Sequence, residues 1–474
     1  MDSALGKRQD MVQVVRIGLA LSLELALSWL LNTTIFAAYD SVLPEARDIS
    51  MVILSAIGLA MTVVATRRPR LFVEKAATPL FLGLFLAGVV LSLWGVSLGS
   101  PLLVTVGSVA RSVGLIWPFI MLGVALMNLE STVAAMTVSC AFVCEYLWKT
   151  AASILPFNVN IGLYALLPFV IIALVRRYSV DAFALFAKSD SRANLQVTSP
   201  ASFLPFTHTL FVTIIVFNAA SGFSLSFGSV ASMPQYPLFS FIPLVVVAML
   251  VVRFRRIAVD RLFQAATLLI LTGLLCIVAL QAGVIGLEVP WTQAFLTAGA
   301  DCFALLVWYV VTRLAGRNVL GALPMLLFLF TAQIIGIVVG AAYGHFANAT
   351  MGSYPAWAMG LVLLTVLLFV AYNLVVLKSF SFEATLTQVA PIRKVFFSMG
   401  AATLEENCRK VAERRGLTPR EAEIMELLAR GRNSQAIQEK LTVSRNTVKT
   451  HVKNIYLKLD VHSQQELIDL VERA

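Results

Sequence analysis

The sequence predicts an all-α protein, in which a polytopic membrane helix bundle is followed by a small four-helix domain. Of its 474 residues, 59% are hydrophobic and only 13% are charged, and the mean hydropathy is +0.84. Soluble domains carry about a quarter charged residues, so most of this chain belongs in lipid. After Lys378 polar and charged residues become frequent. We therefore expect a membrane domain at 1–378, a cytoplasmic linker at 379–415 and a soluble domain at 416–474.

About twelve segments of the first domain are apolar enough, at about 20 residues each, to cross a bilayer as helices. The first of them is too long for the apolar part of a signal peptide, so it is expected to remain as a helix. The predicted spans are 17–38, 49–66, 77–97, 102–127, 132–153, 158–175, 207–228, 237–252, 262–285, 292–312, 320–343 and 354–377.

The charges of the connecting loops predict the orientation, because short loops rich in Lys and Arg stay in the cytoplasm. Such residues precede the first span and follow every second span: Lys7, Arg8, Arg16, "TRRPR" (66–70), Arg176, Arg177, "RFRR" (253–256), Arg313 and Arg317. The alternate loops carry acids or almost no charge, apart from Arg47; they lie around 40–48, 98–101, 229–236, 286–290 and 344–352. An even number of spans then predicts a multi-pass cell-membrane protein with both termini in the cytoplasm.

The longest interior linker, 176–203, divides the spans six and six, and an Arg cluster follows the second span of each half. This pattern resembles the major facilitator fold, in which two parallel six-helix repeats surround a central cavity. The loop "VVATRRPRLF" (63–72) lacks the Gly and Asp that precede the basic cluster in that family. The resemblance therefore implies an architecture, and it leaves active transport by that family's mechanism in doubt.

Ionisable and amide side chains inside the spans indicate a candidate site, because charge is costly in lipid and usually faces a bundle interior. Four of them lie in spans one, four, seven and ten, which line the cavity in the facilitator architecture, and aromatic residues lie near the same depth. The predicted cavity residues are Glu24, Arg111, Asn218, Asp301, Trp117 and Trp308, with Tyr309 beside them. They predict a pocket for an aromatic or planar small molecule.

Structural roles for the same residues stay open. Arg111 paired with Asp301 or Glu24 would hold the two halves together, and aromatic residues at helical spacing often only pack. Glu145 and Lys149 are four residues apart on one predicted helix, a spacing at which they can pair with each other.

Helix-capping residues divide the soluble domain into helices. A short helix is expected at 404–415, stopped by Gly416. Thr418, Pro419 and Glu421 are the N-cap, the first-turn proline and the capping-box acid of a helix that runs to Gly431. Three further helices follow: one capped by Asn433 or Ser434 that ends near Leu441, one capped by Ser444 after the turn "TVS" (442–444), and one opened by Ser463 and Glu466.

The helix that begins after Ser444 has two distinct faces. Val448, Val452, Ile455 and Leu459 recur at steps of four, three and four, which predicts one buried stripe. The positions between them carry polar and positive side chains, which are typical of a helix that docks against an anion. The members of this second face are Asn446, Lys449, Thr450 and Lys453.

The segment "LTPREAEIMELLARGRNSQAIQEKLTVSRNTVKTHVKNIYLKLDVHS" (417–463) closely resembles the LuxR-type helix-turn-helix domain of bacterial transcription regulators. The resemblance implies that its third helix enters the major groove of double-stranded DNA and that the protein pairs as a homodimer on DNA. By resemblance, Asn446, Lys449, Thr450 and Lys453 face bases, and Ser434, Ser444 and Arg445 lie near phosphate. Three positions depart from the family pattern: Gln438, Asp460 and Gln464.

We expect neither an enzyme nor a cofactor, because the four histidines show no metal-ligand spacing and no catalytic constellation is apparent. The five cysteines are scattered and are interpreted as packing residues. The sequence thus suggests that the membrane domain senses a small-molecule ligand or a membrane partner and that the C-terminal domain binds operator DNA. Two alternatives remain: a transporter with a DNA-binding tail, and a membrane-anchored regulator that proteolysis releases through 379–403.

Overall fold

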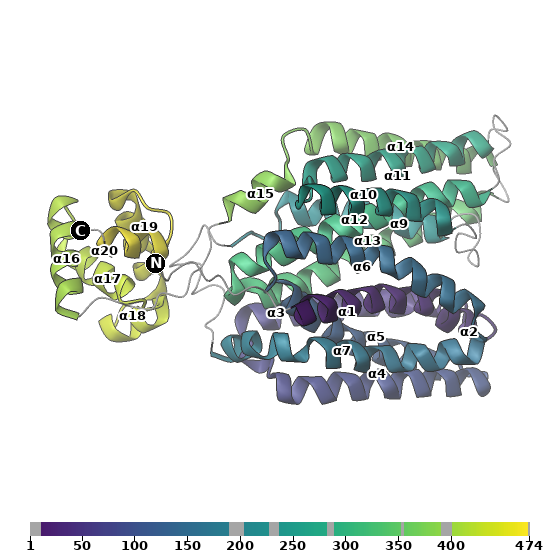
Figure 1. Cartoon of the computed structure of the whole chain (residues 1–474), viewed down its shortest axis with the longest axis horizontal. Coiled ribbons are helices and arrows are strands. Elements are labelled where there is room, and N and C mark those ends of the chain that lie inside the picture. The colour runs from purple at the N-terminus through teal and green to yellow at the C-terminus, as the bar shows by residue number, and fades with distance from the viewer. Residues whose placement is uncertain are drawn as a thin grey trace.

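The computed structural model describes residues 11–188, 203–226, 237–281, 289–351, 355–389 and 401–472. Every regular element in these ranges is a helix, as the sequence predicts. The helices form a large apolar bundle and a small domain with a hydrophobic core of its own (Figure 1). Lys7 and Arg8, the predicted loop 229–236, most of 286–290 and residues 390–400 of the linker lie outside the described residues.

The first half of the bundle begins with one continuous helical run from Met11 to Tyr39. A π-helical turn interrupts this run, and such turns are frequent at functional sites. The elements of this half are α1 (Met11–Leu30), η1 (Leu31–Ile35), α2 (Phe36–Tyr39), α3 (Ala46–Arg67), α4 (Glu74–Ser97), α5 (Pro101–Leu126), α6 (Ser131–Ile154) and α7 (Phe157–Lys188).

The second half repeats the arrangement with six more helices. They are α9 (Thr209–Ser226), α10 (Pro237–Phe254), α11 (Val259–Gln281), α12 (Val289–Arg317), α13 (Val319–Met351) and α14 (Pro355–Ala371), which a π-helical turn, η4 (Tyr372–Val376), extends. Ten helices of the described chain are long and apolar enough to span a bilayer, and Thr209–Phe223 and Phe241–Phe254 are shorter apolar helices. The described residues of each predicted span lie almost entirely on one of these helical runs.

The two halves contact each other through a few helices. Helix α3 packs against α13, and α6 packs against α10 and α12, so each half provides helices that lie along the other. Within a half, small residues allow the closest approaches, as is common in membrane bundles. A Cβ atom added to Gly88 of α4 would overlap the backbone nitrogen of Arg111 on α5. Helices α4 and α5 therefore touch backbone to backbone.

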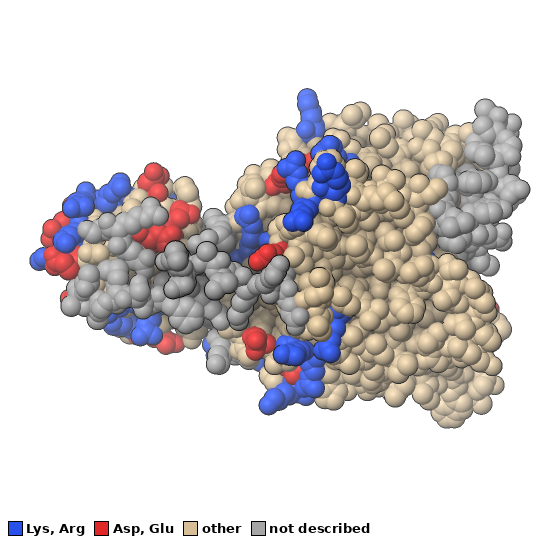
Figure 2. Space-filling view, viewed as in Figure 1, with Lys and Arg blue, Asp and Glu red and all other residues tan. Residues whose placement is uncertain are grey.

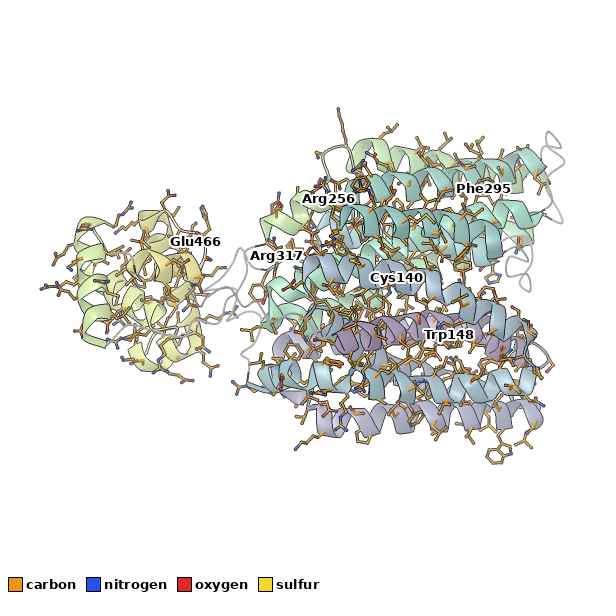
Figure 3. All side chains as sticks on the ribbon, viewed as in Figure 1. Cys140, Trp148, Arg256, Phe295, Arg317 and Glu466 are labelled. Carbon is orange, nitrogen blue, oxygen red and sulfur yellow. The ribbon has the colours of Figure 1, made fainter. Side chains whose placement is uncertain are left out.

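Charged residues gather at one end of the bundle. The sides of the bundle in Figure 2 are almost free of charge, whereas blue Lys and Arg side chains of both halves collect at the end nearest the small domain. We call this the basic end; its residues are Arg67, Arg68, Arg70, Arg176, Arg177, Arg253, Arg255, Arg256, Arg313 and Arg317. Figure 3 labels Arg256 and Arg317 there and Phe295 toward the opposite end, which we call the far end.

The small domain contains five described helices: α16 (Ala401–Arg414), α17 (Pro419–Ala429), α18 (Ser434–Leu441), α19 (Arg445–Leu459) and α20 (Gln464–Glu472). Left-handed residues end the first four, namely Gly416, Gly431, Thr442 and Asp460. Asp460 has φ 56° and its N–H donates to the carbonyl of Tyr456, so an Asp closes α19 where the family usually has Gly or Asn. Leu467 and Val471 of α20 are fully buried and close the helical bundle.

Candidate nucleic-acid interface and ligand-site residues

Helix α19 shows the two faces that its sequence predicts. Val448, Val452, Ile455 and Leu459 are at most 2% exposed and lie in the core of the small domain. Asn446, Lys449, Thr450 and Lys453 are all exposed on the other side of the helix. The core thus fixes the rotation of α19 and directs its polar face into solvent, where a DNA groove can receive it.

The N-terminus of α19 is also exposed. Ser444 is the N-cap, and its Oγ accepts the N–H of Thr447 at 3.1 Å and lies 2.8 Å from the Thr447 Oγ1. Arg445 follows it with an exposed side chain. A helix N-terminus carries a partial positive charge and attracts phosphate, so this position suits a backbone contact with DNA.

Ser434 is the other residue predicted near phosphate, and Gln438 and Gln464 are two of the three departures from the family pattern. All three make contacts within the domain. Ser434 is fully buried at the start of α18, so it has no exposed surface for phosphate in this conformation. Gln438 donates to the carbonyl of Ser434 at 3.0 Å. Gln464 donates to the carbonyls of Leu428 at 2.9 Å and Arg432 at 3.1 Å, so it caps the end of α17.

The capping box at the start of α17 also holds the end of α19. Thr418 N–H donates to the Glu421 carboxylate at 2.8 Å, and Glu421 N–H donates to the Thr418 hydroxyl at 3.3 Å. The same carboxylate accepts Lys458 Nζ at 2.7 Å, which ties the end of α19 to the start of α17. The hydrogen bonds from Lys458 and from the Thr418 backbone lower the pKa of Glu421, so the carboxylate is ionised at neutral pH and holds both helices.

Replacing Lys449 with Ala is expected to separate base reading from simple charge attraction. If its ammonium donates to a guanine edge, the change costs about 1–3 kcal/mol of binding free energy on cognate DNA alone. Arg445→Ala, at the helix start, is expected to weaken cognate and random DNA alike and to reduce the log–log salt slope by about one unit. The measurement is a titration of fragment 401–474 with both duplexes at two salt concentrations.

Lys440→Ala is the matched control, because Lys440 is an exposed cation on α18 and does not belong to the polar face of α19. It is expected to change cognate binding by much less than Lys449→Ala does. Equal losses for Lys449→Ala on cognate and random duplexes would remove Lys449 from the base-reading residues.

The predicted cavity residues of the membrane domain lie in separate surroundings. Arg111 is completely buried in the first half, where its Nη1 donates to the Tyr164 hydroxyl at 2.7 Å. Among the described residues it forms no ion pair with Glu24 or Asp301. Asp301 of α12 instead accepts the Tyr146 hydroxyl of α6 at 2.8 Å, a contact that joins the two halves. Tyr164 and Tyr146 are therefore partners that the sequence reading missed.

The aromatic and amide members of the predicted cavity are packed. Trp117 donates to Thr78 at 2.8 Å, and its ring lies 5.5 Å from that of Phe81 and 4.9 Å from that of Phe183, all within the first half. The ring of Trp308 lies 4.7 Å from that of Phe119, which joins α12 to α5. Asn218 makes a local contact with the carbonyl of Ile214, whereas the Tyr309 hydroxyl on α12 lies 2.9 Å from that of Ser131 on α6 and so joins the two halves. Lys149 pairs with Glu145 at 2.7 Å on the same helix.

Polar contacts bridge the halves at both ends of the bundle. At the far end, His345 Nε2 of α13 lies 2.7 Å from the Asp48 carboxylate of α3. At the basic end, Arg313 of α12 donates to the carbonyl of Leu129, in the turn between α5 and α6, at 2.7 Å. Arg47 also joins the halves at the far end, because its Nη2 donates to Ser226 of α9 at 3.1 Å. Its position as the one cation in an otherwise acidic loop was the sequence signal for this contact.

A short helix at the basic end, α15 (Phe382–Gln388), was interpreted as linker from its sequence. Asp260, at the start of α11, accepts the Ser381 hydroxyl at 2.7 Å and the Phe382 N–H at 2.8 Å. Arg317, at the end of α12, donates to the carbonyl of Val389 at 2.9 Å. The only sequence signal for this element was Ser381, which caps the helix by accepting the Ala384 N–H.

Comparison with known proteins agrees with this division of the chain. Residues 415–471 match the family model of bacterial regulatory proteins of the luxR family. The chain is 47% identical over 66 residues to the uncharacterized response regulatory protein YgeK of Escherichia coli (strain K12); the match covers 13% of this chain and 45% of that protein. The chain thus covers less than half the length of this relative.

The membrane domain is similar to a solved transporter structure. That protein is a bacterial homologue of the iron transporter ferroportin in its outward-facing state with soaked iron. The TM-score is 0.50 at 15% identity, over 77% of this chain and 99% of that one. A second structure of the homologue in the outward-facing state gives 0.46 at 15% identity, over 76% and 98%. At this identity the first likeness shows a shared fold and nothing more.

The described helices, the family match and the shared fold confirm the predicted architecture. Residues 415–471 form a helix-turn-helix domain of the luxR family of bacterial regulatory proteins, which is fused to a membrane domain of major-facilitator-like fold.

Proposed function

We propose that this protein is a membrane-embedded transcription regulator, in which the membrane domain senses a small ligand or a membrane partner and the C-terminal domain binds operator DNA as a pair. The observation that carries the proposal is the attachment of α15 to the membrane domain. The positive-inside rule supports a cytoplasmic location for the basic end, and hence for both termini. A DNA-binding domain on that side of the membrane reaches the chromosome.

Helix α15 connects the last span to the DNA-binding domain, and the second half of the bundle holds it at both ends. Asp260 accepts a hydrogen bond from the N-terminus of α15, and Arg317 donates one to the carbonyl of Val389 just after the C-terminus of α15. Phe382 is completely buried, with its ring 5.0 Å from that of Phe263 on α11. Three different contacts therefore make α15 move with α11 and α12.

This attachment links motion in the membrane to the DNA-binding domain. The halves of such folds move largely as rigid bodies, so a ligand that shifts one half against the other also moves α15. Residues 390–400 separate Val389 from α16, and even fully extended they reach only about 40 Å. The DNA-binding domain therefore stays near the membrane surface, and its access to a second copy or to DNA depends on how α15 is placed.

The test disturbs the membrane domain without a ligand and measures occupancy of the DNA sites that the full chain binds in a genome-wide map. Asp48→Ala removes the far-end contact with His345 and the contact with the neighbouring Arg47 at 3.1 Å; the His345 pair, which joins the halves, is partly exposed and worth at most about 1 kcal/mol. It is expected to change operator occupancy by about two- to fivefold, because 1 kcal/mol corresponds to about a factor of five. The same change in a chain with Asp260→Ala is expected to have no effect, because α15 is released.

Asp40→Ala is the matched control, since Asp40 is an exposed acid at the same end of the first half. It should leave occupancy unchanged. If Asp48→Ala altered occupancy equally with and without Asp260→Ala, coupling through α15 would be refuted. If Asp48→Ala had no effect in the full chain, sensing by movement of the two halves would be refuted.

A transporter with a DNA-binding tail is the second candidate, because the fold is shared with an iron transporter homologue. Within the described residues, no group of three His, Cys, Asp or Glu side chains is placed to hold a metal ion. A metal cargo therefore has no supporting site in this part of the chain. Concentrative uptake of a small molecule into proteoliposomes would favour the transporter over the sensor.

A further inference from the structure

The polar atoms that lack partners are concentrated in one half of the bundle. Among the described residues, every buried side-chain nitrogen or oxygen without a hydrogen-bond partner belongs to the first half. These atoms belong to Glu24, Asn32, Ser108, Arg111, Ser139 and Asn160. Native structures satisfy nearly all buried polar groups, so such a concentration needs an explanation.

Arg111 is the most unusual member of this set. It is completely buried, its Nη1 donates to Tyr164, and its Cζ lies 5.2 Å from the Phe36 ring centroid and 5.9 Å from that of Tyr164. Its Nε and Nη2 have no partner among the described residues. These two nitrogens lie on the same edge of the guanidinium, where their N–H groups form the fork that receives both oxygens of a carboxylate.

The described part of the chain offers no carboxylate to this fork. Glu24 interacts electrostatically with Tyr164, but it forms no ion pair or hydrogen bond with Arg111 among the described residues. Asp301 bonds Tyr146 on a different helix. An unpaired cation inside a membrane bundle is costly and by default indicates a functional site.

Two of the other unpartnered groups lie about one helical turn from Arg111 or from its partner Tyr164. Ser108 is three residues before Arg111 on α5, and Asn160 is four residues before Tyr164 on α7, so each shares a face with a member of the cluster. The Ser108 hydroxyl and the Asn160 Oδ1 are buried without partners. Arg111 therefore offers a cationic fork beside two aromatic rings, and two more unpartnered polar groups lie one helical turn along α5 and α7.

The backbone around Arg111 is held firmly. A Cβ atom at Gly88 would overlap the Arg111 nitrogen, so α4 and α5 leave no room for the main chain to shift. Tyr39 approaches from the first span and donates to Ser92 of α4 at 2.7 Å. Such rigidity suits a site whose binding group must stay in a fixed orientation.

We propose that Arg111 binds the carboxylate of a small organic acid with a planar apolar body, within the first half of the bundle and nearer its far end than its basic end. The fork receives the two carboxylate oxygens, and the rings of Phe36 and Tyr164 contact the apolar body. This inference rests on the proposed sensing function, for which it names the ligand class and the binding residue.

The test uses the purified full chain and benzoate, the simplest aromatic carboxylate. Benzoate is expected to raise the Tm of the protein, whereas benzamide, its neutral analogue, is not. Arg111→Lys keeps the charge but loses the planar fork, and it should weaken benzoate binding at least tenfold, measured by calorimetric titration. Arg176→Lys is the matched control, because Arg176 is a half-exposed arginine at the basic end. It should bind benzoate like the unchanged chain.

Four results would overturn the proposal: no benzoate binding to the folded chain, equal binding of benzamide, equal binding by Arg111→Lys, or Arg111-dependent binding of inorganic phosphate without benzoate. If Arg111→Lys does not fold, Tyr164→Phe gives the answer, because it removes the hydroxyl that fixes Nη1 and should weaken benzoate several-fold. An undiminished affinity in that variant would count equally against the site. Because this titration contains no DNA, its outcome is independent of whether the membrane domain controls operator occupancy.

Discussion

Val452→Asp is expected to unfold the C-terminal domain and abolish DNA binding. Val452 is 2% exposed in the middle of α19, within the core that joins all five helices of the small domain. A buried carboxylate without a partner costs several kcal/mol, which is comparable to the whole stability of about 5–15 kcal/mol of a typical domain. Circular dichroism of fragment 401–474 should show the loss of cooperative unfolding.

Asn454→Asp is the control, because it places the same carboxylate two residues along α19 at an exposed position. This variant should fold with a nearly unchanged Tm. A folded Val452→Asp fragment that still bound DNA would show that the stripe is not the core of the domain.

Gly340→Leu is expected to have the largest effect in the membrane domain. Helices α9 and α13 pack backbone to backbone, and a Cβ atom at Gly340 would overlap the carbonyl oxygen of Ala219. Overpacking costs about 1–3 kcal/mol where side chains can adjust, and more here because two backbones must separate. The full chain should lose its monodisperse peak in detergent, whereas fragment 401–474, which lacks this helix, keeps its DNA affinity.

Gly360→Leu is the matched control on α14, because nothing lies within 4 Å of a Cβ atom at Gly360. It should elute like the unchanged chain. If Gly340→Leu eluted and melted like Gly360→Leu, the close approach of α9 and α13 would not be needed for stability.

The local structure of the chain was largely predictable from its sequence. The capping box of Thr418 and Glu421, the stripe that contains Val452 and the left-handed Asp460 all depend on residues within four positions of each other. Helical periodicity and capping act over this short range, so the sequence expresses them directly. Bilayer thickness likewise sets the length of the spans, which is why the described residues of the predicted spans lie almost entirely on helices.

The partners of the buried charges were not predictable in the same way. Arg111 and Asp301 were placed in one cavity because their spans are cavity-lining in the facilitator architecture, yet they bond Tyr164 and Tyr146 respectively. Trp117, six residues after Arg111, belongs to the packed interior of the first half. Which residue meets which depends on the rotation and depth of each helix against its neighbours, and hydropathy leaves both undetermined.

The sequence by itself thus determined the membrane bundle, its loop-charge asymmetry and the DNA-binding helix with its polar face, because each follows from composition or from contacts within a few residues. Only the tertiary structure decided that Asp260 and Arg317 hold α15, that Asp48 meets His345, and that the guanidinium edge of Arg111 has no partner. Each of these features depends on how helices that are distant in the sequence lie against one another. They exist only once close packing has fixed the position of every helix, because packed interiors admit few alternative arrangements.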